Sequence, residues 1–380
     1  MGAAARTYLD HNATAPLRPQ AREAVLAALD LAGNPSSVHA EGRAARAAVE
    51  RAREEVACLV GARPRDVVFT SGGTEANATV LRPARPDQRL LVGATEHLSV
   101  RDGHGFPPEQ VEVVPVDAHG LIRLDRLEQS LGRGGPALVS VQAANNETGV
   151  VQPLAEIGPL VRAHGGTLHA DAVQALGRVP VDLAAPGADV VTVSAHKIGG
   201  PKGAGALVVA EGGAVPALLR GGGQERGARA GTENVAGLAG FGAAAAAVRH
   251  GLAAEAARVE RLRDLAAAAL RRAAPDAVVF GEGVPRLPNT LLFALPGLSA
   301  EAALIRFDLE GVAVSSGAAC SSGKVRRSHV LDAMGVDPAL AAGAVRASFG
   351  WSSTDADLEC FVQACEKLAR SLYHRCASAA

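Results

Sequence analysis

Apolar and polar positions follow two different patterns along the chain, and the first covers residues 65–210. Short runs rich in β-branched residues repeat there, each followed by a stretch with apolar residues at helical spacing. This alternation predicts a mostly parallel sheet with helices on both faces, whose ligands gather beyond the carboxyl ends of the strands. The predicted strands are residues 67–70, 90–94, 111–116, 137–142, 167–171, 190–194 and 206–209.

The second pattern begins after Gly227. An alanine-rich region, residues 232–274, carries apolar residues at helical spacing and predicts one long helix. Three further runs, residues 291–295, 312–315 and 345–349, predict strands of a smaller α+β domain. We therefore expect an α/β protein of two domains, with the boundary inside the long helix.

The composition is that of a folded globular chain. Of the 380 residues 48% are hydrophobic, and 38 Lys and Arg stand against 39 Asp and Glu, a net charge of −1. These values exclude a mainly disordered chain and argue against a general nucleic-acid binder or a protein drawn to an anionic membrane. The least polar stretch, residues 236–248, is shorter than the ~20 apolar residues of a membrane-spanning helix, so it predicts a buried helix.

The cysteines favour a reduced, cytoplasmic protein. There are five, an odd number, without the spacing of a structural zinc site, and the N-terminus carries no export or myristoylation pattern. Cys58, Cys360 and Cys365 are interpreted as buried small apolar residues. Cys320 differs, because it lies among serines and glycines in a stretch too polar to pack in a core, which predicts an exposed loop.

A candidate phosphate site lies at residues 68–77, which read V-F-T-S-G-G-T-E-A-N. The letters predict a strand that enters Gly72 and Gly73 and then a helix opened by Thr74. Amides at a helix N-terminus bind phosphate, and glycines allow its close approach. An ordinary glycine turn with Thr74 as the helix cap explains the same letters, so this segment alone leaves both interpretations open.

Two later strands end in chemically useful side chains. Asp171 ends one predicted strand, with Gln174 three residues later, and Lys197 follows another strand in the sequence S-A-H-K. Taken alone, Asp171 is as readily a helix cap as a functional carboxylate. Lys197, taken alone, fits the interpretation as an ordinary surface residue. At the carboxyl edge of a central strand, however, partial burial lowers the pKa of a lysine and frees its amine to form a Schiff base.

Together these residues predict a pyridoxal-phosphate site. This cofactor needs a phosphate cradle, a lysine for the Schiff base and a carboxylate paired with the pyridinium nitrogen, so that the ring acts as an electron sink. The sequence supplies all three. His97 follows the predicted strand 90–94, where a ring-stacking side chain is expected, although a lone histidine at such a place is more often structural.

A series of motifs then follows in order: Y-L-D-H-N-A-T-A-P at 8–16, G-N-P-S-S-V-H at 33–39, T-S-G-G-T-E-A-N at 70–77, A-T-E-H at 94–97, N-N-E-T-G-V-V-Q at 145–152, D-A-V-Q at 171–174, S-A-H-K-I-G-G-P-K-G at 194–203, G-G-G-Q-E-R-G-A-R-A-G-T-E-N at 221–234, S-S-G-A-A-C-S-S-G at 315–323 and V-R-A-S-F-G at 345–350. In these motifs the chain resembles the group I cysteine desulfurases, the iron–sulfur-cluster and nitrogen-fixation type. They belong to the class V aminotransferase family of fold-type I pyridoxal-phosphate enzymes. The resemblance implies a large domain with a mostly parallel seven-stranded sheet at residues 15–255, and a small α+β domain made of residues 1–14 and 256–380.

The resemblance also implies a role for each matched residue. Lys197 would form the Schiff base and then serve as acid and base, while Asp171 would pair with the pyridinium nitrogen. Gln174 would contact the phenolic oxygen of the ring, and His97 would stack on the ring face. The phosphate would be held by Gly73, Thr74, Ser194 and His196, joined by Thr232 from the partner subunit of a homodimer. Asn146 would contact the cofactor and the substrate, and Arg346 would clamp the substrate carboxylate.

For Cys320 the resemblance implies an attack on the sulfur of bound L-cysteine, which leaves L-alanine and a persulfide on the enzyme. The persulfide sulfur would pass to an acceptor such as an iron–sulfur scaffold protein, for use in cluster assembly or tRNA thiolation. A transient iron–sulfur cluster at Cys320 is also among the expectations. No direct nucleic-acid or membrane partner is expected. The alternatives are a selenocysteine lyase, a small-amino-acid aminotransferase of the same fold, or a protein that only binds the cofactor.

Overall fold

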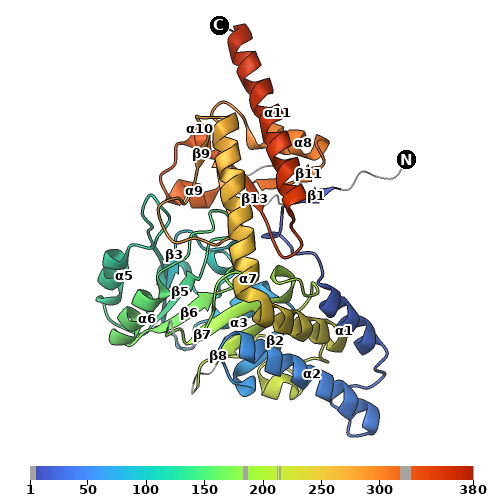
Figure 1. The fold of residues 1–380 in the computed structure, drawn as a ribbon. Coiled ribbons are helices and arrows are strands. Elements are labelled where there is room, and N and C mark those ends of the chain that lie inside the picture. Colours follow the sequence, from blue (N-terminus) through green and yellow to red (C-terminus); the bar gives the residue numbers. More distant parts are fainter. Residues whose placement is uncertain (1–5, 183–186, 212, 214, 317–326, 380) are drawn as a thin grey trace.

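The computed structural model describes residues 6–182, 187–211, 213, 215–316 and 327–379. A seven-stranded sheet and a four-stranded sheet are joined by a single long helix, and a two-stranded sheet lies with the smaller of the two (Figure 1). Every strand predicted from the apolar runs is present, with ends that differ by no more than about two residues. The segment with Cys320 lies outside the described residues.

The large sheet confirms the predicted seven-stranded, mostly parallel architecture. Only β8 runs antiparallel to its neighbours β2 and β7, whereas the remaining neighbours pair in parallel. All six residues of β5 are buried, as expected for a strand covered on both faces. In spatial order the strands are β2 (Val67–Thr70), β8 (Gly205–Val209), β7 (Val190–Ser194), β6 (Thr167–Asp171), β5 (Ala137–Gln142), β3 (Arg89–Gly93) and β4 (Val111–Val114).

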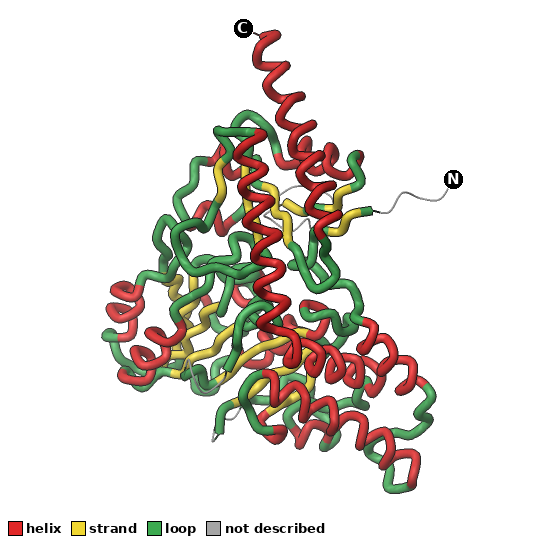
Figure 2. The backbone as a smooth tube through the Cα atoms, viewed as in Figure 1, coloured by secondary structure: helices red, strands yellow, loops and turns green. Residues whose placement is uncertain are grey.

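Helices cover the large sheet on both sides (Figure 2). In α5, Leu127 and Leu131 lie one turn apart and are buried, which shows how a short amphipathic helix presents one face to the sheet. The helices of this part are α1 (Pro19–Leu29), α2 (Ala40–Leu59), α3 (Gly73–Val80), α4 (Leu98–Arg101), α5 (Leu124–Leu131) and α6 (Leu154–Ala163).

The predicted long helix is α7 (Val235–Ala273), and it contributes to the cores of both parts. Phe241 and Val248 pack in the core of the large sheet, whereas Leu262 and Leu270 pack in the core of the small one. Its length and apolar composition would suffice to cross a membrane, a property that it shares with the core helices of globular proteins. Here α7 packs against α1, α2 and α11, and most of residues 236–248 are buried, as predicted.

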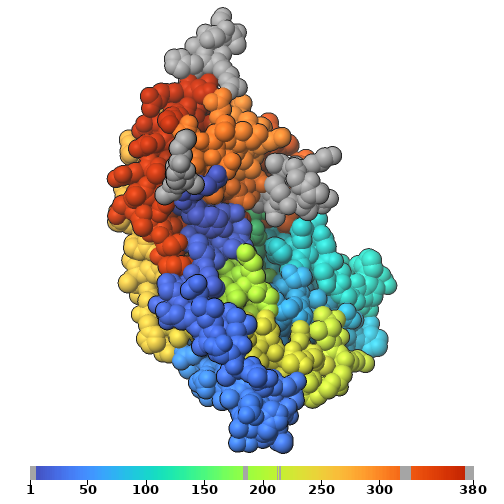
Figure 3. Space-filling model, turned by 90° about the vertical axis from the view of Figure 1, so that its right-hand side faces the viewer, coloured from blue at the N-terminus to red at the C-terminus, as the bar shows by residue number. Residues whose placement is uncertain are grey.

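The small part combines the end of the chain with its beginning. An antiparallel sheet has the order β12 (Ser315–Ser316), β13 (Val345–Ser348), β10 (Thr290–Ala294) and β9 (Val278–Val279). Strand β1 (Thr7–Tyr8) pairs in parallel with β11 (Val312–Ala313), so the first described residues (dark blue) lie against the orange and red surface in Figure 3. Its helices are α8 (Ala300–Leu309), α9 (His329–Ala333), α10 (Pro338–Ala341) and α11 (Asp355–Ala379).

The structure corrects two of the three cysteines interpreted as buried. Cys365 is buried in α11, but Cys58 in α2 and Cys360 in α11 are exposed. The helical period explains the difference, because Phe361, Ala364 and Cys365 form the inward face of α11 and Cys360 falls outside it. Residue type alone does not reveal on which side of a helix a cysteine lies.

Candidate active site

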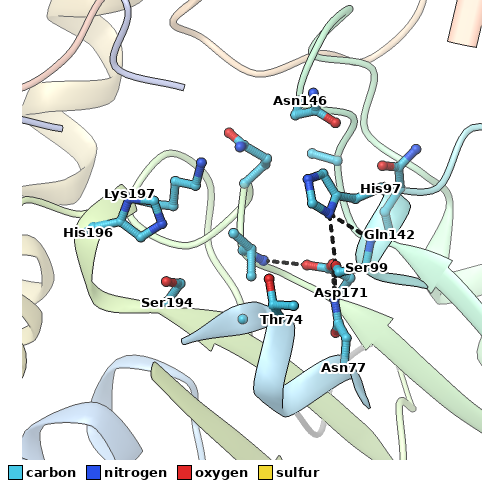
Figure 4. A pocket seen from close by; sticks show the side chains of 14 residues that line it. Thr74, Asn77, His97, Ser99, Gln142, Asn146, Asp171, Ser194, His196 and Lys197 are labelled. Carbon is cyan, nitrogen blue, oxygen red and sulfur yellow. Dashed lines mark hydrogen bonds between the residues drawn. The ribbon is translucent and has the colours of Figure 1, made fainter. Parts of the chain in front are cut away.

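A cavity of about 250 Å³ opens at the carboxyl ends of the large sheet. It brings together residues from the ends of β5, β6 and β7, from the start of α3 and from the segment after β3 (Figure 4). Two of the predicted site residues, Thr232 and Arg346, do not line it. The predicted residues that do line it are Gly73, Thr74, His97, Asn146, Asp171, Gln174, Ser194, His196 and Lys197.

The start of α3 forms the floor of the cavity. Gly73 is the first residue of this helix, and a Cβ atom at this position would lie 2.8 Å from Cγ2 of Val173. A side chain at Gly73 would therefore crowd Val173, which lines the same cavity. Thr74 follows with its side chain toward the cavity, so this helix end offers unpaired N–H groups to an anion.

Asp171 is the last residue of β6, and no helix begins among the described residues that directly follow it, so its carboxylate caps a turn rather than a helix. One oxygen, Oδ1, accepts the backbone N–H of Val173 at 3.0 Å, as a capping carboxylate would. The other, Oδ2, accepts Nδ2 of Asn77 at 2.8 Å. The side chain also lines the cavity, so the cap fixes a carboxylate that faces the site.

A chain of polar groups connects Asp171 to His97 (Figure 4). Nδ2 of Asn77 donates to Asp171 and also to Oγ of Ser99 at 2.9 Å, and Oγ of Ser99 lies 2.8 Å from Nδ1 of His97. Nδ1 of His97 also accepts the backbone N–H of Ser99 at 3.1 Å, which assigns the proton of the neutral ring to Nε2. Burial lowers the pKa of His97, so the neutral ring predominates near pH 7.

Lys197 follows β7 in a short 3₁₀ turn, Ala195–Lys197. Its Nζ donates to the backbone carbonyls of Asn12 at 2.6 Å and Ala13 at 3.0 Å. Burial lowers the pKa of this amine to about 7, and the positive charges of Arg178 and Arg346 act in the same direction. An amine with such a pKa exchanges protons readily near neutral pH.

His196, the neighbour of Lys197, is held by the N-terminal segment. Its Nδ1 lies 2.7 Å from Oγ1 of Thr14, and its backbone carbonyl accepts the N–H of Ala15 at 2.9 Å. Burial, and then the charge of Lys197, lower the pKa of His196 to about 4. The ring is therefore neutral near pH 7 and offers a hydrogen bond rather than a charge.

Arg346 on β13 stands behind the cavity. Its Nη1 donates to the carbonyl of Asn146 at 3.0 Å and its Nη2 to Oδ1 of Asp10 at 2.7 Å, while its buried Nε has no partner among the described residues. The guanidinium thus keeps a donor free next to the Asn146 loop. Thr232 lines a different pocket, together with Phe69.

Four residues that support this site were missed by sequence reasoning: Asn12, Asn77, Ser99 and Arg178. Asn77 was recoverable, because it lies one turn after Thr74 in the same motif and so faces the same side of α3. Ser99 stands two residues after His97 and caps the same turn. Asn12 and Arg178 reach the site through backbone carbonyls, and no local pattern marks such contacts.

Comparison with known proteins places the chain in a family. The model of the class-V aminotransferases matches residues 7–361. The chain belongs to this family. A cysteine desulfurase IscS of Dictyoglomus turgidum is 37% identical over 374 residues, which cover 96% of this chain and 95% of the relative. The fold assignment agrees: the structure of a NifS-like protein from Rickettsia africae superposes with a TM-score of 0.89 at 36% identity, covering 96% of this chain and 99% of that one.

A further solved structure of this family type is described as SspA in complex with cysteine. It superposes with a TM-score of 0.78 at 28% identity and covers 90% of this chain and 99% of that one. These similarities confirm the predicted family and the fold-type I architecture.

Proposed function

We propose that this protein is a cysteine desulfurase, which removes sulfur from L-cysteine, releases L-alanine and holds the sulfur as a persulfide on Cys320. The observation that carries the proposal is a buried lysine with a pKa of about 7 that shares one cavity with a fixed carboxylate, Asp171, and with His97. The relatives named cysteine desulfurase and the related structure with cysteine support the same reaction.

The residues of the cavity fit pyridoxal phosphate. Because Gly73 has no side chain, the cavity stays open at the start of α3, where helix amides bind a phosphate, and the buried Oε1 of Gln174 has no partner among the described residues. We infer that Gly73, Thr74, Ser194 and His196 hold the phosphate, that Asp171 faces the ring nitrogen and Gln174 the phenolic oxygen, and that His97 covers the ring. When bound, the cofactor supplies an electron sink.

The protein's own groups then bind, orient and move protons. Nζ of Lys197 carries a proton to and from the substrate carbon, which suits an amine whose pKa lies near 7. Asn77 and Ser99 hold the His97 ring in one orientation. Asn146 and Arg346 orient the substrate carboxylate, with the free Nε of Arg346 as one donor.

In the sulfur step the Cys320 thiolate bonds to the sulfur of the substrate as the carbon–sulfur bond breaks. The electron pair of that bond stays with carbon, which takes up a proton to give alanine. The products are therefore one alanine and one enzyme persulfide, with no external oxidant or reductant. A reductant or an acceptor thiol is needed only to release the sulfur afterwards.

We further propose that the enzyme is a cytoplasmic homodimer in which Thr232 of each subunit completes the phosphate site of the other. In one chain Thr232 lies in a pocket apart from Lys197, so it has no contact with the Lys197 cavity of its own subunit. The persulfide would serve an acceptor such as an iron–sulfur scaffold protein. Tests of the dimer are its mass in solution and the cofactor affinity of Thr232→Ala.

The decisive experiment measures alanine and sulfide after L-cysteine and a reductant are added to the protein with pyridoxal phosphate. The two products should form in equal amounts, and Cys320→Ala should abolish both catalytic turnover and sulfide while the visible absorption of the cofactor persists. Cys360→Ala is the matched control, because it removes an exposed thiol on α11 and should leave the rate unchanged. Full activity of Cys320→Ala, or no alanine from the unaltered protein, would contradict the proposal.

A further inference from the structure

Arg178 is a buried cation that bonds to no carboxylate among the described residues. Its residue is only 7% exposed, and it donates through Nη1 to the carbonyl of Gln174 at 2.5 Å and through Nη2 to the carbonyl of His11 at 3.3 Å. It forms no salt bridge with a carboxylate in the part of the chain that the structure describes. The charge of Glu255 also acts on Arg178, but that carboxylate is bonded to Arg18. Burying a cation without a directly bonded carboxylate is unfavourable, so its presence in this place needs a reason.

Arg18 shows the ordinary solution a short distance away. Arg18 and Arg178 line the same small cavity, but Nη2 of Arg18 lies 2.8 Å from a carboxylate oxygen of Glu255. That pair carries no net charge. Arg178 therefore adds a net positive charge to the cavity wall, which Arg18 does not.

Lys197 is the neighbour that this charge reaches. Arg178 and Lys197 donate to consecutive carbonyls of one N-terminal segment: Arg178 to that of His11, and Lys197 to those of Asn12 and Ala13. Both side chains line the small cavity of about 20 Å³, whereas only Lys197 also lines the larger one. Arg178 therefore acts beside the amine without touching a molecule bound in the larger cavity.

Apart from Arg178, the charges that act on Lys197 are one cation and two carboxylates. Arg346 on β13 is paired with Asp10 of the N-terminal segment at 2.7 Å. Asp171 at the end of β6 is the remaining carboxylate that acts on the amine. His196 in the 3₁₀ turn and His97 after β3 are neutral near pH 7, because burial lowers the pKa of each. Arg178, on the segment after β6, has no hydrogen-bonded carboxylate among the described residues, and its charge opposes that of Asp171 at the amine.

We propose that Arg178 is a positioning residue of the proposed desulfurase reaction, whose fixed buried charge favours the unprotonated form of the Lys197 amine. A like charge within about 4–6 Å disfavours the protonated form of an amine. The fall in the pKa of Lys197, in which Arg178 is the largest cause after burial, supports this role. The inference rests on the proposed function for its purpose, but the electrostatic effect is measurable without cysteine.

The chain is well suited to such a measurement because it has only four lysines: Lys197, Lys202, Lys324 and Lys367. The full-length protein without added cofactor is labelled at a series of pH values from 5.5 to about 9 with a trace of acetic anhydride, which reacts with unprotonated amines. Peptide mass spectrometry then measures the extent of acetylation of each lysine. Removing a like charge in Arg178→Met should raise the labelling midpoint of Lys197 by about one pH unit. At pH 7 this corresponds to about fivefold less label on Lys197, with Lys367 unchanged as the internal standard.

Two further variants separate charge from packing. Arg178→Lys keeps the charge and should label like the unaltered protein, whereas Arg178→Gln keeps a donor and should behave like Arg178→Met. The double variant Arg18→Met, Glu255→Gln removes an arginine from the same wall without changing the net charge and should leave the midpoint of Lys197 in place. Circular dichroism shows which variants fold. If Arg178→Met does not fold, the comparison of Arg178→Lys with Arg178→Gln decides whether the charge matters.

A second readout uses the enzyme with its cofactor. The acidic limb of the pH profile for alanine formation should move upward in Arg178→Gln by the same interval as the labelling midpoint. Unchanged labelling of Lys197 in both Arg178→Met and Arg178→Gln, or an Arg178→Lys that matches them, would overturn the inference. If labelling moves as expected but the unaltered enzyme forms no alanine, the proposed function fails and the charge effect on Lys197 stands.

Discussion

Two regions support the cavity around Lys197, and the chain builds them in different ways. The first, the sheet edge, consists of His97, Asp171, Ser194, His196 and Lys197, each at or just after the end of a strand of the large sheet. The second, the N-terminal network, consists of Asp10, Asn12, Asn146 and Arg346, which hydrogen bonds join across more than a hundred residues of sequence.

The two regions also differ in what they offer. The sheet edge presents titratable side chains to the cavity. In the N-terminal network backbone carbonyls do much of the work: that of Asn146 accepts both Nδ2 of Asn12 and Nη1 of Arg346, and that of Asn12 accepts Nζ of Lys197 and Nε2 of Gln174. In the proposed function, the sheet edge would carry the chemistry and the N-terminal network would set the orientation of the groups that perform it.

The largest effect should come from the sheet edge with Lys197→Ala. Removing the amine that moves the proton should lower kcat for alanine formation by about a thousandfold, in the range of general acid–base contributions. The initial rate with L-cysteine checks this, and the melting temperature serves as the control for folding. A rate within tenfold of the unaltered enzyme would place the chemistry elsewhere.

Asp171→Asn should have the next largest effect. The amide keeps the shape and still accepts the N–H of Val173, but it lacks the charge that faces the ring nitrogen. We expect a loss of about a hundredfold in kcat, similar to the removal of one electrostatic contact in other active sites. Asn77→Ala is the companion variant, because it leaves the charge in place and should cost less; an equal loss in both would assign the effect to geometry instead.

The pH dependence of stability tests the contribution of Glu147, which is next to Asn146 of the N-terminal network. Burial raises the pKa of Glu147 to about 7 from a usual value of 4.5, against the hydrogen bond from Ser328. In this window the folded state binds more protons than the unfolded state, so stability falls as pH rises from 4.5 to 7. The unaltered protein should therefore lose stability relative to Glu147→Gln as the pH rises. The difference in free energy of unfolding between the two proteins should change by up to about 3 kcal/mol from pH 4.5 to pH 8, in favour of Glu147→Gln. Urea unfolding of both proteins at the two pH values measures the difference, and a constant difference would refute it.

Asp10→Asn should show the smallest effect, and it should fall on binding. The substitution keeps an oxygen for Nη2 of Arg346 but removes the charge that anchors the guanidinium. We expect KM for L-cysteine to rise about tenfold, the loss of roughly one charge-assisted hydrogen bond, with kcat within twofold. A lower KM would mean that Asp10 competes with the substrate carboxylate, and a large fall in kcat would erase the distinction between the two regions.

The apolar pattern predicted the large sheet well because each parallel strand is buried on both faces and therefore reads as a continuous run, as in β5. The same logic located Asp171 and Lys197, since strand ends of a parallel sheet meet at one edge. Residue type alone failed for Cys58 and Cys360, whose side of the helix depends on what the helix packs against.

The sequence by itself determined the order of the strands along the chain, the long helix and the sheet edge with its glycine turn, carboxylate and lysine, because these follow from local periodicity and from the residue types at strand ends. Only the tertiary structure decided that β1 joins β11, that Asn12 connects Asn146 to Thr290, and that Arg178 lies beside Lys197. The physical reason is that those contacts use backbone carbonyls and charges brought together by packing, which leave no periodic mark on the amino-acid sequence.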